Sequence, residues 1–533
     1  MDRSPPPCVI HEDADLLVVH KPPGWNTHAP SPHAGEGIYE WLRHREPRWA
    51  SLAIVHRLDK DTSGLLVFAR TPRANRSLTA QFAGRLVCKR YQCVTDRRPQ
   101  RDVFSVRSGI VRSGDHYQVA APGARDAAPA ETRFRVLRTE GGRVWLEAVP
   151  LTGRTHQIRV HAASKGVPIL GDRLYGGTPA ARLHLHAWGL ALDHPGTGRP
   201  VSWEVAPEFD RAPAEALRAA MVAPGETTAW RMLHGAADGV PGFAVERLGD
   251  WILVEGEEEV TPTLPGILRP SVAGAAGIYF KARRRRVRGT APGEVSPRFL
   301  EGTPAPTRFE VLENGLRFEL SLAEGYSTGL FLDQRDNRRR LQVGQVAAGF
   351  PLRPSAGGSE PWLLNTFAYT CAFSVAAAVG GWRTTNLDLS RKYLDWGRRN
   401  FELNRLDAGG HEFIHGDVFD WLHRFQRRSR RFDAVLLDPP TFSRSREHGD
   451  FRAESDYGAL VARVLPLLAP GGILFASTNA GRMPPDRFLE GIRGAIASGG
   501  RRVTQQHYAP QPPDFPITRE EPAHLKTVWI RLD

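Results

Sequence analysis

An acidic residue stands inside a turn between two apolar runs, in the stretch IVHRLDKDTSGLLVFAR from Ile54 to Arg70. Asp59 and the following Ser63 and Gly64 are good turn formers, so the local pattern alone favours a structural role. A sheltered carboxylate can instead act as a nucleophile when an arginine partner keeps it ionised. The stretch therefore leaves two roles open for Asp59, a turn residue or a chemical group.

Two further segments carry side chains suited to the same chemistry. One is CKRYQCV, which places Tyr91 on a β-like run, and the other is PLTGRTHQIRVHAASKGVPILGDRLYGG, which is dense in arginine, histidine, glycine and threonine. Together with HRLDKDTSG and the opening EDADLLVVHKPPGWNTHAP, they resemble the RluA family of pseudouridine synthases in order and approximate spacing. The resemblance covers about residues 9–192 and implies RNA pseudouridine synthase activity that needs no cofactor or metal.

The family resemblance implies roles for individual residues of this chain. It makes Asp59 the catalytic nucleophile, lets Tyr91 pack on the flipped uracil and assist proton removal, and pairs Arg159 with the aspartate. Breaking and remaking the glycosidic bond needs an ionised carboxylate. An aromatic side chain compensates for the stacking that the flipped base loses. These physical requirements agree with the implied roles.

Three basic residues beside these motifs have other expected roles. Arg57 either holds the gap left by the flipped base, contacts phosphate, or forms an ordinary ion pair on the sheet. His156 and His161 have no third ligand-type residue nearby, so we expect them to be hydrogen-bonded structural residues. No metal site is predicted here.

The carboxyl-terminal half places polar and aromatic residues directly after successive apolar strands. Loops at the carboxyl ends of strands in a doubly wound sheet bind nucleotide-like ligands, and an acidic residue there can accept hydrogen bonds from ribose hydroxyls. The half has no G-x-G-x-x-G, so a dinucleotide is not the expected ligand. The candidate cofactor-binding residues at these strand ends are Asn365, Phe367, Tyr369, Thr370, Asp388, Asp417 and Asp438.

These strand-end motifs resemble class I S-adenosylmethionine-dependent RNA methyltransferases. The segments GYSTGLFLDQRDNRR, TTNLDLSRKYLDWGRRNFELN and DAVLLDPPTFSRS are similar to the family that modifies 23S rRNA, over about residues 229–533. The resemblance implies S-adenosyl-L-methionine as the cofactor, and it favours a place at the cofactor entrance for Gln334, Arg335 and Asn337. Cys371 stands where relatives have glycine.

The DPPTF loop and the cysteine content bear on the methyl acceptor. The resemblance implies that the loop holds the target base, with a catalytic Asp438 near the reacting atom, Pro439 and Pro440 in contact, and Phe442 as a stacking surface. The closest branch methylates guanine N7, and a sister branch methylates cytosine C5. Attack through cytosine C5 needs a cysteine thiolate that adds at C6, whereas guanine N7 is already nucleophilic and needs chiefly alignment. Cys371 is the only cysteine in this half and belongs to the cofactor loop, and LFASTNAGR has none, so we favour guanine N7.

The elements that must position these residues change in character along the chain. From Val9 to about Leu192, short β-like runs alternate with turns, which predicts an α+β domain with a mixed, largely antiparallel sheet. From about Trp362, short apolar strands alternate with helices, which predicts an α/β doubly wound, Rossmann-like methyltransferase domain. The expected parts are a pseudouridine synthase domain at 1–195, a linker at 196–228, a small α+β RNA- or substrate-binding domain at 229–320, and the methyltransferase domain at 321–533.

Composition and charge limit the class of protein and its partners. At 533 residues the chain is too long for one hydrophobic core. It has neither a run of about 18 uncharged apolar residues nor a signal peptide, so we expect a cytoplasmic protein. Four cysteines without C-x-x-C spacing argue against a disulfide scaffold and a structural zinc site. The net charge of +13 favours a polyanionic partner.

Together these inferences predict a bifunctional enzyme in which a pseudouridine synthase is fused to a methyltransferase. Both parts would act on RNA, with 23S rRNA or a large-subunit precursor as the partner and with no membrane and no metal. The basic run KARRRRVRG, Lys281 to Gly289, is either a solvated face or a phosphate contact. Two alternatives stay open: a cytosine-C5 methyltransferase, and a methyltransferase with a noncatalytic amino-terminal RNA-binding module. No pattern in the sequence indicates an oligomeric state.

Overall fold

The chain folds into two compact units, each with its own buried core. The computed structural model describes residues 4–121, 124, 126–257, 274–283, 296–353, 360–445 and 449–533. The first unit comprises Met1–Pro30, Gly37–Glu40 and Ser51–Ala223, and the second comprises Ser31–Glu36, Trp41–Ala50 and Pro224–Asp533. Of the basic run KARRRRVRG, residues 284–289 lie outside the described residues.

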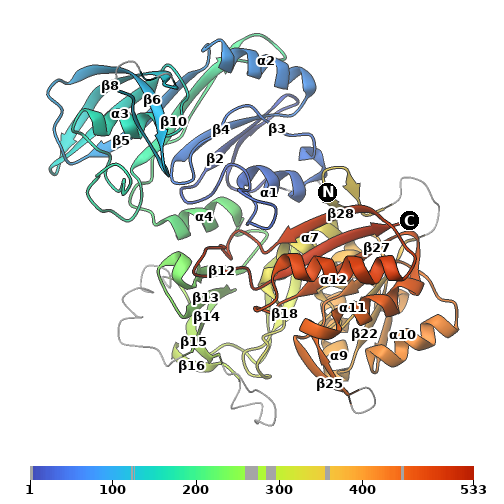
Figure 1. Ribbon diagram of the computed structural model, residues 1–533. Coiled ribbons are helices and arrows are strands. Elements are labelled where there is room, and N and C mark those ends of the chain that lie inside the picture. Colours follow the sequence, from blue (N-terminus) through green and yellow to red (C-terminus); the bar gives the residue numbers. More distant parts are fainter. Residues whose placement is uncertain are drawn as a thin grey trace. The chain divides into compact units, whose positions relative to one another are not determined.

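An 11-stranded mixed sheet forms the frame of the first unit in the part of the chain that is described (Figure 1). Strand pairs are antiparallel except for β4 and β10, which run parallel. In spatial order the strands are β1 (Val9–Glu12), β2 (Leu16–Lys21), β4 (Ser63–Ala69), β10 (Leu185–Asp193), β5 (Cys88–Thr95), β9 (Arg143–Pro150), β8 (Ala128–Glu140), β6 (Val103–Ser113) and β7 (His116–Val119), with β3 (Ala53–Ile54) beside β4 and β11 (Pro200–Glu204) beside β10.

Two helices pack on different parts of this sheet. Helix α2 (Pro72–Ala83) begins where the Thr71 hydroxyl accepts the Ala74 N–H at 3.1 Å, and it packs through Leu78 on the strands β2, β4 and β10. Helix α3 (Gln157–Ser164) packs through Ile158 on β5 and β9. The remaining helical segments before residue 224 are α1 (Ile38–Arg45), the 3-10 turn η1 (Pro47–Trp49) and α4 (Pro213–Met221).

A seven-stranded sheet forms the frame of the second unit in the described residues. Its first five strands are parallel, and β29 runs antiparallel between β27 and β28. The strand order reverses between β21 and β24, and the loops that follow these strands meet at one edge, where open α/β sheets bind ligands. In spatial order the strands are β23 (Glu412–His415), β22 (Arg383–Asp388), β21 (Trp362–Thr366), β24 (Phe432–Leu437), β27 (Leu468–Thr478), β29 (Lys526–Leu532) and β28 (Val503–Pro510).

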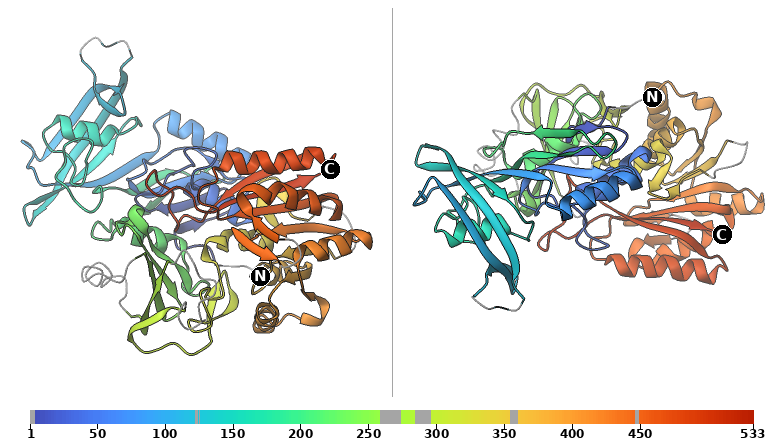
Figure 2. Two further views of the ribbon diagram at one scale, coloured as in Figure 1. Left: turned by 60° about the horizontal axis from the view of Figure 1, so that its bottom comes forward. Right: turned by 90° about the horizontal axis from the view of Figure 1, so that it is seen from above.

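Helices cover both faces of this sheet, and Figure 2 shows the same layering from two further directions. Alternate strand residues point to opposite faces, so Leu363 and Leu436 belong to one apolar cluster while Leu364 and Leu437 belong to another. The inner strand β24 and the second half of β27 are buried on both sides, and their sequences are accordingly almost continuously apolar. The first face carries α7 (Arg335–Val343), α8 (Ala372–Val379) and α9 (Arg391–Leu403), and the second carries α10 (Val418–Arg427), α11 (Ala453–Val464) and α12 (Pro485–Ser498).

Smaller sheets complete the described part of the second unit. In the hairpin of β17 and β18, Asn314 and Gly315 have φ values of 51° and 78°, as a two-residue Asn-Gly turn requires. No helix of the described residues is long and apolar enough to cross a membrane. The strands are β12 (Ala229–His234), β13 (Phe243–Leu248), β14 (Trp251–Gly256), β15 (Gly277–Ala282), β16 (Arg298–Gly302), β17 (Phe309–Glu313), β18 (Leu316–Leu320), β19 (Gln345–Ala347), β20 (Phe350–Pro351), β25 (Phe442–Ser445) and β26 (Gly449–Arg452), with 3-10 turns η2 (Gly235–Asp238), η3 (Leu332–Gln334), η4 (Ala408–Gly410) and η5 (Leu465–Leu467).

Candidate active sites

A cavity of about 650 Å³ lies in the first unit where the three sequence motifs meet. The turn between β3 and β4, strand β5, and the loop that leads into α3 all contribute to its wall. The structure therefore brings together every residue that the sequence assigned to pseudouridine chemistry. The chemically relevant side chains in the wall are Arg57, Asp59, Lys89, Tyr91, His156 and Arg159, of which Arg57 is exposed.

Asp59 forms part of a turn and also faces the cavity. Its carbonyl accepts the Thr62 N–H at 3.1 Å, so the turn-forming role is real. Lys21 stabilises this turn. Its buried ammonium donates to the carbonyl of Lys60 at 3.0 Å and to those of Pro22 and Trp25 at 2.8 Å each. Burial lowers the pKa of Lys21 to about 7 against the attraction of the nearby acidic residues. Sequence reasoning did not single out Lys21. A lysine at the end of the apolar strand β2 was the one sign that this position is unusual.

Tyr91 lies in the middle of the sheet beside the cavity. Its neighbours across the strands are Ala148 of β9 and Ala187 of β10, whose small side chains leave room for the phenol ring. Burial, and then the negative charge of Asp59, raise the pKa of Tyr91 above its ordinary value. The phenol is therefore neutral at physiological pH.

Arg159 does not form the predicted ion pair with Asp59. Its guanidinium binds Asp172 instead, with Nε–Oδ2 and Nη2–Oδ1 distances of 2.7 Å each. Both side chains are buried, and a buried arginine takes the carboxylate that can engage it through two hydrogen bonds. Burial opposes the charge of Arg159, but Asp172, and to a smaller extent Asp59, raise the pKa of Arg159 above its ordinary value.

The two histidines of the third motif differ in role. His161 is a structural residue as expected, since its ring nitrogens hydrogen-bond Thr132 at 2.8 Å and Ser108 at 3.0 Å. His156 is also hydrogen-bonded, and its Nε2 atom in addition lies 4.0 Å from a carboxylate oxygen of Asp59. Its backbone is left-handed, with φ of 56°, and its Nδ1 atom is 2.8 Å from the Tyr175 hydroxyl.

A second cavity, of about 540 Å³, lies in the second unit at the carboxyl ends of β21, β22 and β24. This is the edge at which the strand order reverses. The wall combines acidic residues with aromatic rings. The predicted residues that line it are Phe367, Tyr369, Asp388, Asp417, Asp438, Pro439 and Pro440.

Two predicted cofactor residues lie behind the cavity wall instead of on it. Asn365 is buried and donates from Nδ2 to the Ser374 hydroxyl at 2.9 Å. The Thr370 hydroxyl is also buried and donates to the Gly329 carbonyl at 2.7 Å. Asn365 lies within β21, whereas Thr370 lies between the left-handed residues Tyr369 and Cys371. Asn365 and Thr370 therefore support the loop and do not line the cavity.

Two of the three residues expected at the cofactor entrance also lie elsewhere. Gln334 lines the cavity. Arg335 is buried and binds both carboxylate oxygens of Asp514, at 2.8 and 2.6 Å. Asn337 donates to Gln334 at 2.8 Å and accepts a hydrogen bond from the Trp529 indole at 3.0 Å. Arg335 and Asn337 therefore hold α7 in place.

Phe451 takes the place in the wall that was predicted for Phe442. Phe442 begins β25 and is 43% exposed, with the Arg452 guanidinium 5.5 Å from its ring. The β25–β26 hairpin returns the chain to the cavity, where Phe451 is only 4% exposed and lies 6.1 Å from the ring of Phe419. Sequence reasoning missed Phe451 because its placement depends on this hairpin.

The loop after β21 is strained and presents its backbone to an acidic residue. Phe367, Tyr369 and Cys371 have φ values of 54°, 49° and 58°, a region that non-glycine residues enter at a cost of about 1–3 kcal/mol each. Asp388 accepts the N–H groups of Tyr369 and Ser390, both at 2.8 Å. These bonds fix the Asp388 carboxylate at the end of β22.

Asp438 is the acidic cavity residue directly after β24. Its carboxylate accepts a hydrogen bond from Gln334 Nε2 at 3.3 Å, and the same nitrogen is 2.8 Å from the Ser477 hydroxyl. Burial raises the pKa of Asp438 to about 6, although hydrogen bonds from Ser477 and Gln334 oppose the shift. This group therefore changes charge close to neutral pH.

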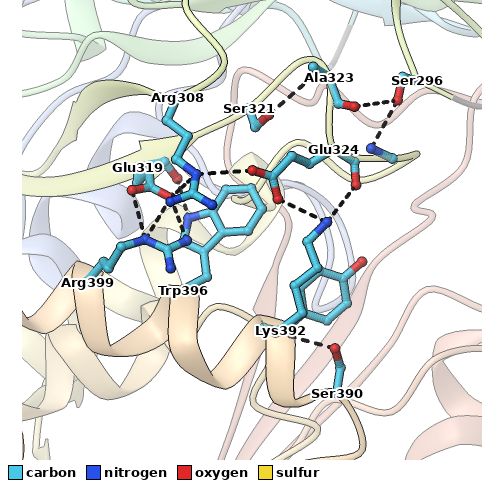
Figure 3. Close-up of polar contacts among 12 residues, drawn as sticks. Ser296, Arg308, Glu319, Ser321, Ala323, Glu324, Ser390, Lys392, Trp396 and Arg399 are labelled. Atoms are coloured by element: carbon cyan, nitrogen blue, oxygen red, sulfur yellow. Dashed lines mark hydrogen bonds and ion pairs between the residues drawn. The ribbon is translucent and has the colours of Figure 1, made fainter. Parts of the chain in front are cut away.

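A polar network holds α9, which carries the cavity residue Tyr393, against β18 and the loop after it (Figure 3). Glu319 binds Arg399 at 2.8 Å, and its carbonyl accepts the Trp396 indole N–H at 3.0 Å. Glu324 binds Lys392 at 2.9 Å. The Tyr393 ring lies 4.6 Å from that of Tyr369, so the network also fixes an aromatic wall of the cavity.

Comparison with known proteins agrees with this division into two sites. Residues 15–164 match the RNA pseudouridylate synthase family, and residues 269–531 match the S-adenosylmethionine-dependent methyltransferase family. A ribosomal RNA large subunit methyltransferase of Deinococcus radiodurans is 32% identical over 332 residues, which cover 60% of this chain and 77% of that protein. The chain belongs to the ribosomal RNA large subunit methyltransferase family.

Other relatives support membership of this family. Ribosomal RNA large subunit methyltransferase I of Cronobacter sakazakii is 31% identical over 307 residues, which cover 56% of this chain and 72% of that protein. The crystal structure of SMU.776 complexed with SAH superposes with a TM-score of 0.50 at 28% identity, covering 64% of this chain and 88% of that one. The second unit thus carries the family's S-adenosylmethionine-dependent methyltransferase domain.

The second cavity suits this family's cofactor. Asp388, fixed by two backbone N–H groups, can accept hydrogen bonds from ribose hydroxyls. Phe331 and Tyr369, with ring centres 5.3 Å apart, offer apolar surface to a purine. When bound, the cofactor supplies an electrophilic methyl group. Asp438, Pro439 and Pro440 lie in the same wall, where they can border the methyl acceptor.

Proposed function

We propose that this protein is a bifunctional RNA-modifying enzyme. Its first unit isomerises uridine to pseudouridine, and its second unit transfers a methyl group from S-adenosyl-L-methionine to guanine N7 of 23S rRNA. The observation that carries the first activity is the meeting of Asp59, Tyr91 and Arg159 at one cavity. Membership of a methyltransferase family and the strand-end cavity with Asp438 support the second.

The wall of the first cavity supplies the groups that base isomerisation needs. Asp59 attacks the sugar or the base as a carboxylate, and Tyr91 packs against the flipped uracil. Arg159, oriented by Asp172, contributes positive charge near the carboxylate without being its hydrogen-bonded partner. Arg57 is exposed and lines the cavity, which supports a role in contacting phosphate or filling the gap left by the base.

The chemistry of Cys371 favours guanine N7 over cytosine C5 as the methyl acceptor. It is the only cysteine after residue 223, and its side chain is fully buried beside Gly397, where an added Cβ would overlap the sulfur. Burial raises the pKa of the Cys371 thiol well above its ordinary value. A buried neutral thiol cannot add to cytosine C6. Guanine N7 needs no such nucleophile, only alignment with the methyl group.

The substrate is inferred from charge and from relatives. The net charge of +13 favours binding to a polyanion. The curated relatives named above are ribosomal RNA large subunit methyltransferases, which supports large-subunit rRNA as the substrate of both units. Holding both sites on one chain raises the effective concentration of the second site near RNA bound by the first.

Nucleotide-resolution mapping of 23S rRNA from a deletion strain tests the proposal. We expect one or more pseudouridines and one 7-methylguanosine to disappear, and to return with the intact gene. Complementation with Asp59→Ala should restore the methyl group alone. Return of pseudouridine with Asp59→Ala would instead support a noncatalytic amino-terminal RNA-binding module.

A Cys371→Gly variant separates the two methyl acceptors. Glycine suits the left-handed φ of 58°, and we expect methylation within about 3-fold of the unchanged enzyme because Cys371 supports the loop only. Methyl transfer is measured with labelled cofactor on rRNA from the deletion strain, followed by nucleoside analysis. Appearance of 5-methylcytidine as the product, together with its loss in Cys371→Gly, would replace guanine N7 by cytosine C5.

A further inference from the structure

Asp333 is a further acidic residue in the wall of the second cavity. It lies in the 3-10 turn η3 that precedes α7, and its side chain is 17% exposed. Asp438, Pro439 and Pro440 line the same cavity. Burial is the main cause of the raised pKa of Asp438, and the charge of Asp333 adds to it, so the two carboxyl groups lie near each other. Asp333 is therefore close to the place expected for the methyl acceptor.

The carboxyl group of Asp333 is ionised. Burial opposes its charge, but a hydrogen bond from His524 and two nearby arginines lower the pKa of Asp333 below its ordinary value. Each arginine binds another carboxylate, so it stabilises the charge of Asp333 from a distance. The arginine pairs are Arg231 with Glu246 at 2.7 Å, and Arg338 with Glu313 at 2.6 and 2.7 Å.

His524 holds one oxygen of this carboxylate. Oδ2 of Asp333 lies 3.1 Å from Nε2 of His524, and an ionised carboxylate can only accept, so Nε2 carries the hydrogen. The His524 ring lies beside those of His234 and Phe515, with ring centres 5.8 and 5.9 Å away. In the described part of the chain no donor bonds Oδ1 of Asp333. The carboxylate is thus oriented from one side and can accept further hydrogen bonds from a ligand.

The place of His524 along the sheet puts Asp333 on the acceptor side of the cavity. Thr478 at the end of β27 pairs with Lys526 at the start of β29, so His524, two residues earlier, lies at the edge that bears the cavity. Neighbouring strands are about 4.8 Å apart, so the start of β29 lies about 10 Å beyond β24 and about 19 Å from β22. Asp388, which suits the ribose, ends β22. Asp333 is therefore nearer to the methyl acceptor than to the ribose.

The other acidic residues in the described wall have different partners. Asp438 accepts a hydrogen bond from Gln334, and its pKa of about 6 leaves it partly protonated near neutral pH. The remaining three accept main-chain N–H groups of their own loops. These are Asp388 with Tyr369 and Ser390, Asp417 with Phe419, and Asp456 with Arg452.

The two acceptor atoms of a carboxylate match one nucleobase. The Watson–Crick edge of guanine presents two adjacent donors, N1–H and the N2 amino group. Cytosine and adenine each present one amino donor beside a ring nitrogen whose lone pair a carboxylate repels, and uracil presents one N–H between two carbonyls. N7 lies on a different edge of guanine, so it stays open to the methyl group while the Watson–Crick edge is held.

We propose that Asp333 selects the guanine that is methylated, by accepting hydrogen bonds from its N1–H and N2 amino groups. The inference rests on the proposed guanine-N7 activity of the second unit and names the residue that recognises the base. His524 is a positioning residue, because its bond to Oδ2 orients the carboxylate while each oxygen keeps a lone pair for the base. The carboxylate is held before RNA arrives, which lowers the cost of ordering it.

The same contact also favours the reaction. As N7 takes the methyl group, its lone pair forms the new bond, the pair of the broken methyl–sulfur bond stays on sulfur, and the purine becomes a cation. The positive charge makes N1–H a stronger donor, and the ionised Asp333 attracts that charge. The hydrogen bonds are therefore stronger in the transition state than in the bound substrate, so they accelerate methyl transfer.

The test compares guanosine with inosine, which lacks only the N2 amino group, at the methylated position. Full-length 23S rRNA is assembled by splinted ligation with either nucleoside at the position that mapping in the deletion strain identifies. Methyl transfer by the full chain is measured with labelled cofactor under single-turnover conditions. We expect the unchanged enzyme to methylate inosine RNA at least about 10-fold more slowly, since the carboxylate loses one donor.

An Asp333→Ala variant should lose this preference. We expect it to methylate guanosine RNA at least about 30-fold more slowly than the unchanged enzyme, and to methylate the two RNAs at rates within about 2-fold of each other. Its affinity for SAH, measured by titration calorimetry, should stay within about 3-fold, which also shows that the variant folds. His524→Phe should reduce the preference to about 3-fold, because it removes only the group that orients the carboxylate.

Asp456→Asn is the matched control. It changes another acidic residue of the same cavity, one that bonds the Arg452 N–H at 2.7 Å, and it should keep the preference for guanosine at about 10-fold or more.

The outcomes distinguish this inference from the proposed function. Equal rates on the two RNAs with the unchanged enzyme, or an undiminished preference in Asp333→Ala, would overturn the role of Asp333 while leaving N7 methylation in place. SAH binding weakened more than about 10-fold in Asp333→Ala would assign the carboxylate to the cofactor instead. Absence of 7-methylguanosine with the unchanged enzyme would overturn the proposed methyl acceptor and this inference together.

Discussion

At the scale of single residues, Asp438 links the chemistry of the methyltransferase cavity to the stability of the fold. Burial raises its pKa to about 6 in the folded protein, whereas an aspartate in an unfolded chain ionises near 3.9. Between these values the folded state holds a proton that the unfolded state has lost. Stability from this group is therefore fully present below about pH 4 and falls as the pH rises through 6.

An Asp438→Asn variant should gain stability and lose methyl transfer. At pH 7.5 we expect the methyltransferase unit to be more stable than in the unchanged protein by about 2 kcal/mol, because the buried charge is gone, while methyl transfer is lost at least about 100-fold. Near pH 4 the two proteins should unfold alike. Thermal unfolding at each pH measures the difference in stability. The transition of the methyltransferase unit is the one that shifts when SAH is added. Equal stability at pH 7.5 would contradict the argument.

At the scale of elements, helix α9 supports one wall of the second cavity. Its polar side chains bind Glu319 of β18 and Glu324 of the loop that follows β18. Lys392 donates to both the carboxylate and the carbonyl of Glu324, at 2.9 and 3.2 Å (Figure 3). Hydrogen bonds from Lys392 and Arg308 lower the pKa of Glu324 against the effect of burial. The network therefore favours one position for Tyr393 and Ser327 in the wall.

Loosening this support should weaken cofactor binding without abolishing it. Lys392→Met removes a half-exposed charge, so we expect SAH to bind about 3-fold more weakly, equivalent to less than 1 kcal/mol, with an unchanged melting temperature for the first unit. Titration calorimetry with SAH measures the change. Asp395→Asn, which breaks only an exposed pair with Arg398 on the same helix, is the matched control and should leave binding unaltered.

The elements also show which parts of the site the sequence could predict. Strand-to-helix alternation predicted the ends of β22 and β24, and Asp388 and Asp438 at these ends line the cavity. The direction in which a loop side chain points was not predictable from the sequence. Left-handed backbone at the neighbouring residues decides whether a side chain such as Thr370 faces the cavity or the interior. Asp172 lies in the same motif as Arg159, but their ion pair depends on how the turn after α3 folds back, which no local period predicts.

At the scale of the whole molecule, the two cavities lie in separate compact units that have different sheets and separate cores. Residues 15–164 and 269–531 match two unrelated enzyme families. Neither cavity contains a side chain from the other matched region. The two chemistries should therefore be separable by mutation, while the single chain links them through the RNA.

Single-site variants test this separation. Asp59→Asn should abolish pseudouridine formation by about 10³-fold or more and keep methylation within about 2-fold, and Asp438→Asn should do the reverse. An equimolar mixture should restore both modifications to the RNA population. Mapping both marks on single RNA molecules at limiting enzyme should find fewer doubly modified molecules than with the unchanged chain, because the linkage is lost. A concerted loss of both activities in either variant would contradict independence.

The antiparallel insertion of β29 between β27 and β28 has a consequence for how the protein is made. While the ribosome is still synthesising the segment after Thr478, the apolar strand β27 has no partner on one side, since β29 begins only at Lys526. An open apolar edge can pair with other nascent chains. We expect the methyltransferase unit to depend on chaperones until this strand emerges, and translation stalled before Lys526 to yield aggregates in which the first unit can already be folded.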